Sequence, residues 1–356
     1  MFVGIADTFT VSFASEVEVS GVSLVSSFNT VLIFLFTALS SGGAVIISQY
    51  IGSRRNDLAS RASGQLLMLS SLLSAVLTAL ILLFQSPLLK LLFGRIETDV
   101  MTACRTYLFI TTLSLPFLAV YDAGAALCRS IGKTNVTMYI SIAANVINVA
   151  GNCIGVFLLH MGAAGVAYPS LLSRILSAIA VTAYCFRREN PVHYKLSDIF
   201  CQDGALLKKI IHIALPNGVE NGVHQLVKVA LSSMVALFGT YQIAANGVAQ
   251  SIWSLAAIMG LAMAPVYTTV IGQYMGAKDI DAANFYFKKL NRITLLLSIL
   301  WNALIFALTP LIVRYSAISP KRKSWCSGWS SSIIFLTAWH ILLPVLWAAG
   351  CGPPGT

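Results

Sequence analysis

Six polar side chains recur along one face of a helix that we expect near the middle of the chain. They are Asn217, Glu220, Asn221, His224, Gln225 and Lys228. At 100° per residue they fall within an arc of about 140°, and the residues between them are apolar. This mixture of amides, an acid, an imidazole and an amine predicts the lining of a polar, ligand-binding cavity. The alternative is a cluster of charged side chains that joins neighbouring helices.

Amide side chains form a second stripe, without charge, on a helix expected over residues 135–159. Its members are Ser141, Asn145, Asn148 and Asn152. They lie within about 60° of one another around the helix. Amides so placed can bind a ligand or bridge two helices, and the spacing leaves both interpretations open. A weaker stripe of Gln242, Asn246 and Gln250 is typical of contacts between helices.

Three further charges stand alone inside apolar stretches. Asp7 is the best candidate for a coupling-ion site, because a carboxylate held away from water can exchange a proton or bind a cation. A purely structural role for Asp7 stays open. We expect Asp122 to pair with another helix and Arg174 to balance a buried acid, so both are candidates for structural charges.

The elements that carry these residues are membrane helices. The chain has 356 residues, of which 57% are hydrophobic and only 10% charged, and its mean hydropathy is +0.80. A soluble domain has roughly a quarter charged residues. Apolar stretches of about 20 residues, the length that crosses a bilayer, recur along the chain and are too long for barrel strands. The predicted fold class is all-α integral membrane, because lipid leaves no partner for open backbone groups.

Nine apolar stretches are long enough to be counted as helices, and 333–349 is a candidate tenth. Their expected ranges are 1–14, 21–50, 62–86, 102–128, 135–159, 162–186, 208–237, 242–274 and 286–314. The first range is too short to cross a bilayer at 1.5 Å per residue, so we expect helix one to be clipped.

The formal net charge of +10 follows the topology of the chain. Of the 23 Lys and Arg residues, 14 fall in the loops that follow the second, fourth, sixth and eighth helices. By the positive-inside rule these loops are cytoplasmic, and so is the N-terminus of this multi-pass protein. The charge therefore argues against a nucleic-acid partner.

An internal repeat relates two halves of the chain. Residues 47–59 align with residues 271–283 at an offset of 224, and six of the thirteen positions are identical. Six helices separate the copies, an even number, so both halves enter the membrane in the same direction. Parallel repeats of this kind are typical of transporters whose binding site lies between the halves near the midplane.

The repeat and the polar segments divide the chain. We predict an N-terminal lobe over 1–186, a cytoplasmic linker over 187–207, a C-terminal lobe over 208–319 and an atypical tail over 320–356. The tail holds four of the six tryptophans and ends in a Gly- and Pro-rich segment, so we expect it to be out of frame.

Motifs for enzymatic chemistry do not occur in the sequence. It contains no phosphate-binding loop, no H-E-x-x-H and no G-x-S-x-G, and its seven cysteines lack metal-ligand spacing. We expect no enzymatic activity, no metal centre and no cofactor. If the protein is a pump, an ion gradient is the energy source that remains.

Several segments resemble the multidrug and toxic compound extrusion (MATE) family, in particular its DinF-like and NorM-like bacterial branch. The matching segments are Ala6-Asp-Thr8, Gln49-Tyr-Ile-Gly52, Gln273-Tyr-Met-Gly276, Leu127 to Gly132, Asn148-Val-Ala-Gly-Asn152, Gly162 to Ala167, Leu215-Pro-Asn-Gly-Val-Glu220 and Ala244 to Ala249. The resemblance runs from residue 1 to about residue 318. The chain looks truncated at both ends relative to the family, without counterparts of the last two of its twelve helices.

The resemblance implies a protein of the plasma (inner) membrane with two six-helix lobes, which exchanges Na⁺ or H⁺ for small amphipathic or cationic drugs by alternating access. Asp7 matches the family's acid in helix one, which is thought to bind the coupling ion. A partner position that is often Asp in that branch is Asn152 here, so coupling would rest on Asp7 with Asn148 and Asn152. Glu220 fits the motif that opens helix seven, although some members place the functional acid where this chain has His224.

Two other functions stay in competition with an ion-coupled exporter. A flippase for lipid-linked saccharides would need several cations in the cavity, where only Arg174 and Lys228 qualify. A truncated remnant without transport activity is the other alternative. The partners that we expect are small-molecule drugs or metabolites and the lipid bilayer, and we expect the protein to be a monomer.

Overall fold

A computed structural model describes residue 10 and residues 16–93, 98–200, 203–236 and 240–315, in part as backbone alone. Every regular element in these ranges is a helix, which confirms the predicted all-α class. The helices in chain order are α2 (Glu16–Gly52), α3 (Asn56–Leu83), α4 (Gln85–Phe93), α5 (Thr98–Leu113), α6 (Leu115–Ser130), α7 (Thr134–Cys153), the π-helix η1 (Ile154–Leu158), α8 (Gly162–Cys185), α9 (Leu196–Phe200), α10 (Gly204–Ala236), α11 (Thr240–Gly276) and α12 (Ile280–Tyr315).

Five of the described helices contain segments that are long and apolar enough to cross a membrane. Their ranges are Val17–Gly52, Asn56–Leu83, Thr134–Leu158, Gly162–Cys185 and Ile280–Ala307. The bent pair formed by α5 and α6 makes a sixth candidate. These segments match five of the predicted spans, and the bent pair covers the predicted helix at 102–128.

The chain divides into two compact units, Met1–Gly222 and Val223–Thr356. Their boundary lies inside α10, whereas the predicted lobes divide at the linker. The lobes were inferred from a sequence repeat, which compactness does not test, so they stay a prediction.

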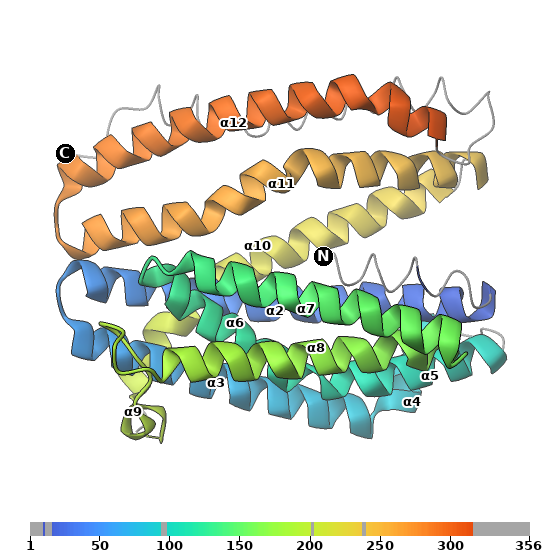
Figure 1. Cartoon of the computed structure of the whole chain (residues 1–356), viewed down its shortest axis with the longest axis horizontal. Helices are drawn as coiled ribbons and strands as arrows, with labels where there is room; N and C mark the ends of the chain where they lie inside the picture. The colour runs from blue at the N-terminus through green and yellow to red at the C-terminus, as the bar shows by residue number, and fades with distance from the viewer. Residues whose placement is uncertain (1–9, 11–15, 94–97, 201–202, 237–239, 316–356) are drawn as a thin grey trace. The chain divides into compact units, whose positions relative to one another are not determined.

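Unit 1 is a helix bundle built around α2 and α6. Helix α2 contacts α3, α5 and α6, while α6 also packs against α3 and α8, and α7 lies along α8 (Figure 1). One apolar core includes Ile47, Leu66 and Ile210, and a second includes Phe36 and Leu108. Small residues allow the closest approaches: a Cβ on Gly155 would lie 2.3 Å from the carbonyl oxygen of Gly165.

The predicted fourth helix is broken in the structure. Helices α5 and α6 meet at a bend of 42°. Pro116 lies in the first turn of α6 and has no backbone N–H to continue the ladder of hydrogen bonds. The Ser114 hydroxyl donates to the Thr111 carbonyl at 2.6 Å and satisfies one acceptor at the break. The expectation of one continuous helix over 102–128 was therefore wrong at Ser114.

Part of the predicted linker folds back on unit 1. The Tyr194 amide donates to the Cys185 carbonyl at 2.9 Å, and its ring packs edge-on against Phe186. Because the phenol is buried away from water, the pKa of Tyr194 is raised well above its ordinary value. Farther along, α9 packs against α3. The segment at 190–200 is therefore a docked part of the bundle.

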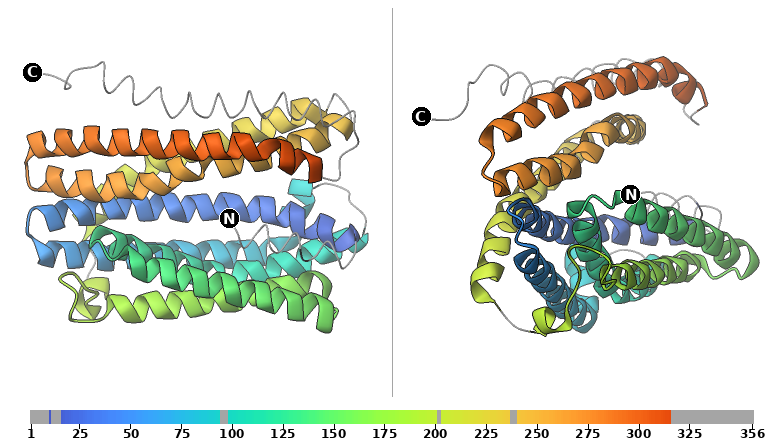
Figure 2. Two further views of the ribbon diagram at one scale, coloured as in Figure 1. Left: turned by 45° about the horizontal axis from the view of Figure 1, so that its top comes forward. Right: turned by 60° about the vertical axis from the view of Figure 1, so that its left-hand side comes forward.

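In unit 2, α11 and α12 form an antiparallel hairpin, which both views of Figure 2 show side by side. The Tyr267 hydroxyl on α11 donates to Asn291 Oδ1 at 2.5 Å and lies 3.1 Å from Thr294 Oγ1 on α12. Phe287 packs edge-on against the Tyr267 ring. Aromatic and polar side chains thus connect the two helices.

The repeat predicted from sequence recurs in the backbone of two turns. Arg54 and Lys278, which are 224 positions apart, have φ angles of 59° and 60°. The Arg54 amide donates to the Ile51 carbonyl at 3.0 Å, and the Lys278 amide donates to the Met275 carbonyl at 3.1 Å. Equivalent sequence positions therefore build the same left-handed turn between two long helices.

Candidate functional site

A pair of amides on α7 forms a fully buried polar group in unit 1. Asn148 and Asn152 are completely buried, with no exposed surface. Asn148 Nδ2 donates to Ser170 Oγ on α8 at 2.8 Å, and Asn152 Nδ2 lies 3.5 Å from Asn148 Oδ1. An amide pair buried in an apolar bundle needs polar partners, because an unpaired group there costs about 1–3 kcal/mol. The structure thus brings together the two amides predicted to assist coupling, and adds Ser170.

The other end of the amide stripe contacts α6 instead. The Tyr121 hydroxyl lies 2.7 Å from Ser141 Oγ, and Asn145 Nδ2 donates to the Ser141 carbonyl of its own helix at 2.9 Å. Asn145 is half-buried, in contrast to Asn148. The stripe therefore has a buried part facing α8 and a more accessible part beside Tyr121.

The stripe on α10 begins with a contact to α2. Asn217 Nδ2 donates to Ser41 Oγ. Asn221 Nδ2 donates back to the Asn217 carbonyl at 2.9 Å and to its Oδ1 at 3.1 Å. Close packing makes this contact possible, since a Cβ on Gly42 would lie only 2.9 Å from the Ala214 amide nitrogen. This part of the stripe joins α10 to α2.

Farther along α10 the stripe is accessible. Glu220 and His224 are exposed and Gln225 is half-buried. Ionisable side chains on a membrane helix are expensive unless they face protein or water, so their accessibility suits a wet surface. Lys228 belongs to the same helix, but its side chain lies outside the described residues.

Asp122 and Arg174, two charges predicted to be structural, interact electrostatically near the bend between α5 and α6. One carboxylate oxygen of Asp122 is buried, and this acid interacts electrostatically with Arg129 and Arg174. Arg174 Nη1 on α8 donates to Ser114 Oγ at 2.6 Å, at the break between α5 and α6. The arrangement is that of charges which hold a bent helix against its neighbour.

An acid that the sequence did not indicate, Glu18 of α2, lies at the N-terminal end of α8. Glu18 Oε2 on α2 accepts a hydrogen bond from the Ala163 amide at 2.8 Å. A carboxylate is favourable there, because the N-terminus of a helix carries partial positive charge. Gly162, with a φ of 55°, lets the chain enter α8 beside this acid. The segment Gly162 to Ala167 that opens α8 was noted in the sequence, but no sequence pattern indicated its contact with Glu18.

Other predicted residues lie outside the described part of the structure. Asp7 lies outside the described residues altogether. Gln242, Asn246 and Gln250 lie in α11, but their side chains are not among those described. Among the residues whose placement is described, no group of three or more His, Cys, Asp or Glu side chains could hold a metal ion.

A bundle of apolar helices with buried amides and ionisable side chains on helix faces defines a multi-pass membrane protein with a polar interior. A family model described as MatE matches residues 1–154 and 216–349. The chain belongs to the MATE family, which is a family of transporters, not of enzymes.

Relatives and solved structures agree with this assignment. The chain is 27% identical over 288 residues to the uncharacterised transporter YisQ of Bacillus subtilis, which covers 80% of this chain and 62% of the relative. It is 24% identical to a probable multidrug resistance protein NorM of Thermotoga maritima, over 78% of this chain and 60% of that protein. The chain therefore spans about three fifths of the length of these relatives.

The fold is that of solved MATE structures. A crystal structure described as MATE in the bent conformation superposes with a TM-score of 0.83 at 20% identity, over 97% of this chain and 80% of that one. A transporter of the MOP superfamily from Pyrococcus furiosus gives a TM-score of 0.80 at 20% identity, over 98% and 82% of the two chains. These likenesses establish the arrangement of the helices.

Proposed function

We propose that the protein is an ion-coupled antiporter of the plasma membrane that exports small amphipathic or cationic organic compounds by alternating access. The observation that carries the proposal is the buried pair of Asn148 and Asn152, tied to Ser170 across two helices. Buried polar groups on membrane helices are expensive and mark ion or substrate pathways. Relatives named as probable multidrug resistance proteins support the substrate class.

In this proposal the ion and the substrate use different groups. Asp7 takes up Na⁺ or H⁺ with help from Asn148 and Asn152, whose amide oxygens are ligands for a hard cation. Substrate contacts the more accessible polar residues. These are Asn145, Asn217, Glu220, Asn221, His224, Gln225 and Lys228. Glu220 on α10 attracts a cationic substrate, while uptake of the ion by Asp7 biases the transporter toward resetting.

A saccharide-lipid flippase is the second candidate, because the Pyrococcus furiosus relative is described as having a binding pocket of reverse polarity that suggests a different function. Such a substrate carries phosphates and needs a cationic cavity. Of the two cations that we considered, Arg174 donates to Ser114 and interacts with Asp122. Antiport of cationic compounds is therefore the better-supported function.

Ethidium efflux from cells that express this chain tests the proposal. We expect Asp7→Asn and Asn152→Leu each to lower the efflux rate by about tenfold or more, since the first removes the negative charge that binds the ion and the second removes an amide oxygen. Asn152→Asp should retain efflux. Ser27→Ala is the matched control, because its exposed hydroxyl bonds only to the Ser23 carbonyl of its own helix.

Coupling is assigned in proteoliposomes with an imposed Na⁺ gradient or an imposed pH gradient. Acceleration by one gradient, and its loss in Asp7→Asn, would identify the ion. If correctly inserted protein shows no efflux, or if Asp7→Asn and Asn152→Leu transport as well as Ser27→Ala, the proposal is wrong.

A further inference from the structure

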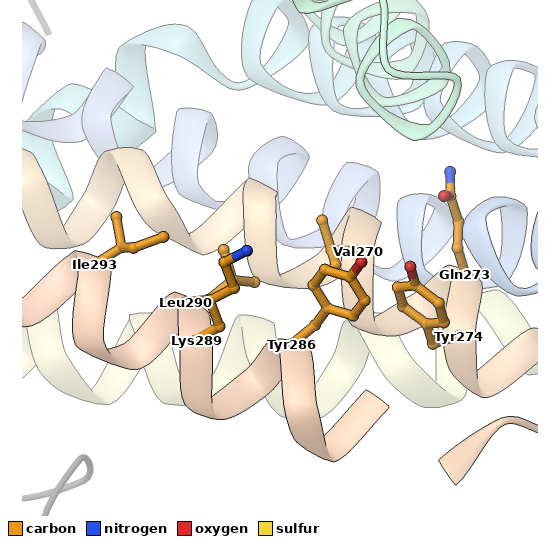
Figure 3. A pocket seen from close by; sticks show the side chains of 7 residues that line it. All are labelled: Val270, Gln273, Tyr274, Tyr286, Lys289, Leu290 and Ile293. Carbon is orange, nitrogen blue, oxygen red and sulfur yellow. The ribbon is translucent and has the colours of Figure 1, made fainter. Parts of the chain in front are cut away.

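A pocket of about 360 Å³ lies between α11 and α12 in unit 2 (Figure 3). Its polar lining consists of Gln273 and Tyr274 from α11 and Tyr286 and Lys289 from α12. The two tyrosine rings stack with their centroids 4.7 Å apart, while aliphatic side chains, including Ile293, line the rest of the pocket. None of these residues belongs to the candidate site described above.

The repeat provides a reference for this pocket inside the same molecule. At the offset of 224, Lys289 corresponds to Gln65 on α3. Gln65 Nε2 donates to the Asp198 carbonyl at 2.7 Å, and Gln65 Oε1 accepts from the Asp203 amide at 3.2 Å. In unit 1 this position of the hairpin is therefore occupied by the backbone of the linker.

The neighbouring residues on α3 are small enough to admit that backbone. Ala62 is fully buried, and a Cβ on Gly64 would lie 3.1 Å from the Asp198 backbone. Their counterparts in unit 2 are Tyr286 and Lys288. Lys289 offers only donors where Gln65 both donates and accepts. The pocket in unit 2 is therefore suited to an anionic ligand with acceptor oxygens.

The position of the pocket indicates where such an anion comes from. It lies in the last two turns of α11 and the first four turns of α12, and Ile280–Ala307 of α12 is a candidate membrane span. Tyrosines favour the boundary between membrane and water, and basic pockets at the cytoplasmic boundary bind anionic lipid headgroups. The loop between α11 and α12 is one of those that the positive-inside rule predicts to be cytoplasmic.

We propose that this pocket binds the headgroup of an anionic phospholipid. The Lys289 ammonium pairs with the phosphate, and the Tyr274 and Tyr286 hydroxyls and the Gln273 amide donate to its ester and glycerol oxygens. Ile293 and the exposed Leu297 and Leu300 farther along α12 provide an apolar surface for the acyl chains. None of its residues belongs to the proposed transport pathway, and the site would hold even for a chain without transport activity.

Lipid retention by the purified chain tests this site without a transport assay. The protein is equilibrated in nanodiscs with equal amounts of phosphatidylglycerol and phosphatidylcholine, released into mild detergent and weighed by native mass spectrometry. We expect wild type to retain phosphatidylglycerol selectively and Lys289→Gln to retain about tenfold less of it, because a charge-assisted hydrogen bond is lost. Lys289→Arg should preserve the selectivity.

Lys288→Gln is the matched control, because it removes the same charge from the adjacent exposed residue, which does not line the pocket. Retention in Lys288→Gln should equal that of wild type. Equal loss of phosphatidylglycerol in the two variants would show that the lipid is held by general surface charge, and the proposed site would be wrong. Displacement of the lipid by millimolar glycerol phosphate would overturn the lipid as occupant and assign the site to a free anion. Circular dichroism checks that each variant keeps its helices.

Discussion

The two copies of the repeated hairpin share a backbone but differ in how their helices meet. In the first copy Gly43 on α2 lies against Leu66 on α3, so closely that a Cβ on Gly43 would be 2.4 Å from a Leu66 methyl carbon. In the second copy the position of Gly43 is Tyr267, whose hydroxyl reaches Asn291 and Thr294. The repeat is therefore defined by its turn, while the contact between the two helices differs from one unit to the other.

A second difference lies next to this contact in the sequence, at Gly64 and Gln65 and their counterparts Lys288 and Lys289. In the first copy Gly64 and Gln65 contact the docked linker. In the second copy these positions are Lys288 and Lys289, and Lys289 lines the pocket between α11 and α12. Placing a residue of one copy at the matching position of the other copy therefore tests each difference separately.

The largest effect is expected for Gly43→Tyr, which places the second copy's residue in the first. Leu66 is fully buried and cannot move away from a whole ring, so the free energy of unfolding should fall by about 3 kcal/mol. Thermal unfolding in detergent, followed by circular dichroism, measures the change.

The control for this substitution is Tyr267→Phe, which keeps the ring and removes the hydroxyl. It should lower the free energy of unfolding by only about 1 kcal/mol, the value of a typical hydrogen bond. If Gly43→Tyr is no more damaging than Tyr267→Phe, the close approach of α2 and α3 is not what distinguishes the copies.

An intermediate effect is expected for Gly64→Lys, which gives α3 the residue found at the same place on α12. A lysine would clash with the Asp198 backbone, so we expect the free energy of local opening of the linker to fall by about 2 kcal/mol. Amide hydrogen exchange of the Tyr194 and Asp203 amides should accelerate about 30-fold. Lys288→Gly is the matched exchange in unit 2 and should leave the linker's protection unchanged; equal protection in Gly64→Lys would refute the docking argument.

The sequence predicted the helical membrane fold and the repeat well, because hydrophobic length and a shared turn are local signals. It also placed Asn148 and Asn152 on one face, where the structure buries them together. It could not reveal Ser170 or Glu18 as partners, because those contacts join helices that are distant along the chain. The bend at Ser114 was missed although Pro116 marked it, since the apolar pattern continues across the break.

The smallest effect concerns the feature that the copies share. Arg54 and Lys278 both adopt a positive φ, which is strained for a residue with a Cβ and free of strain for glycine. Arg54→Gly and Lys278→Gly should therefore each raise the free energy of unfolding slightly, by about 0.5 kcal/mol, although added flexibility of the unfolded chain offsets part of the gain. The informative quantity is the similarity of the two changes. Equivalent turns should respond equally, whereas a gain in one copy and a loss in the other would show that these matching φ angles are held by different surroundings.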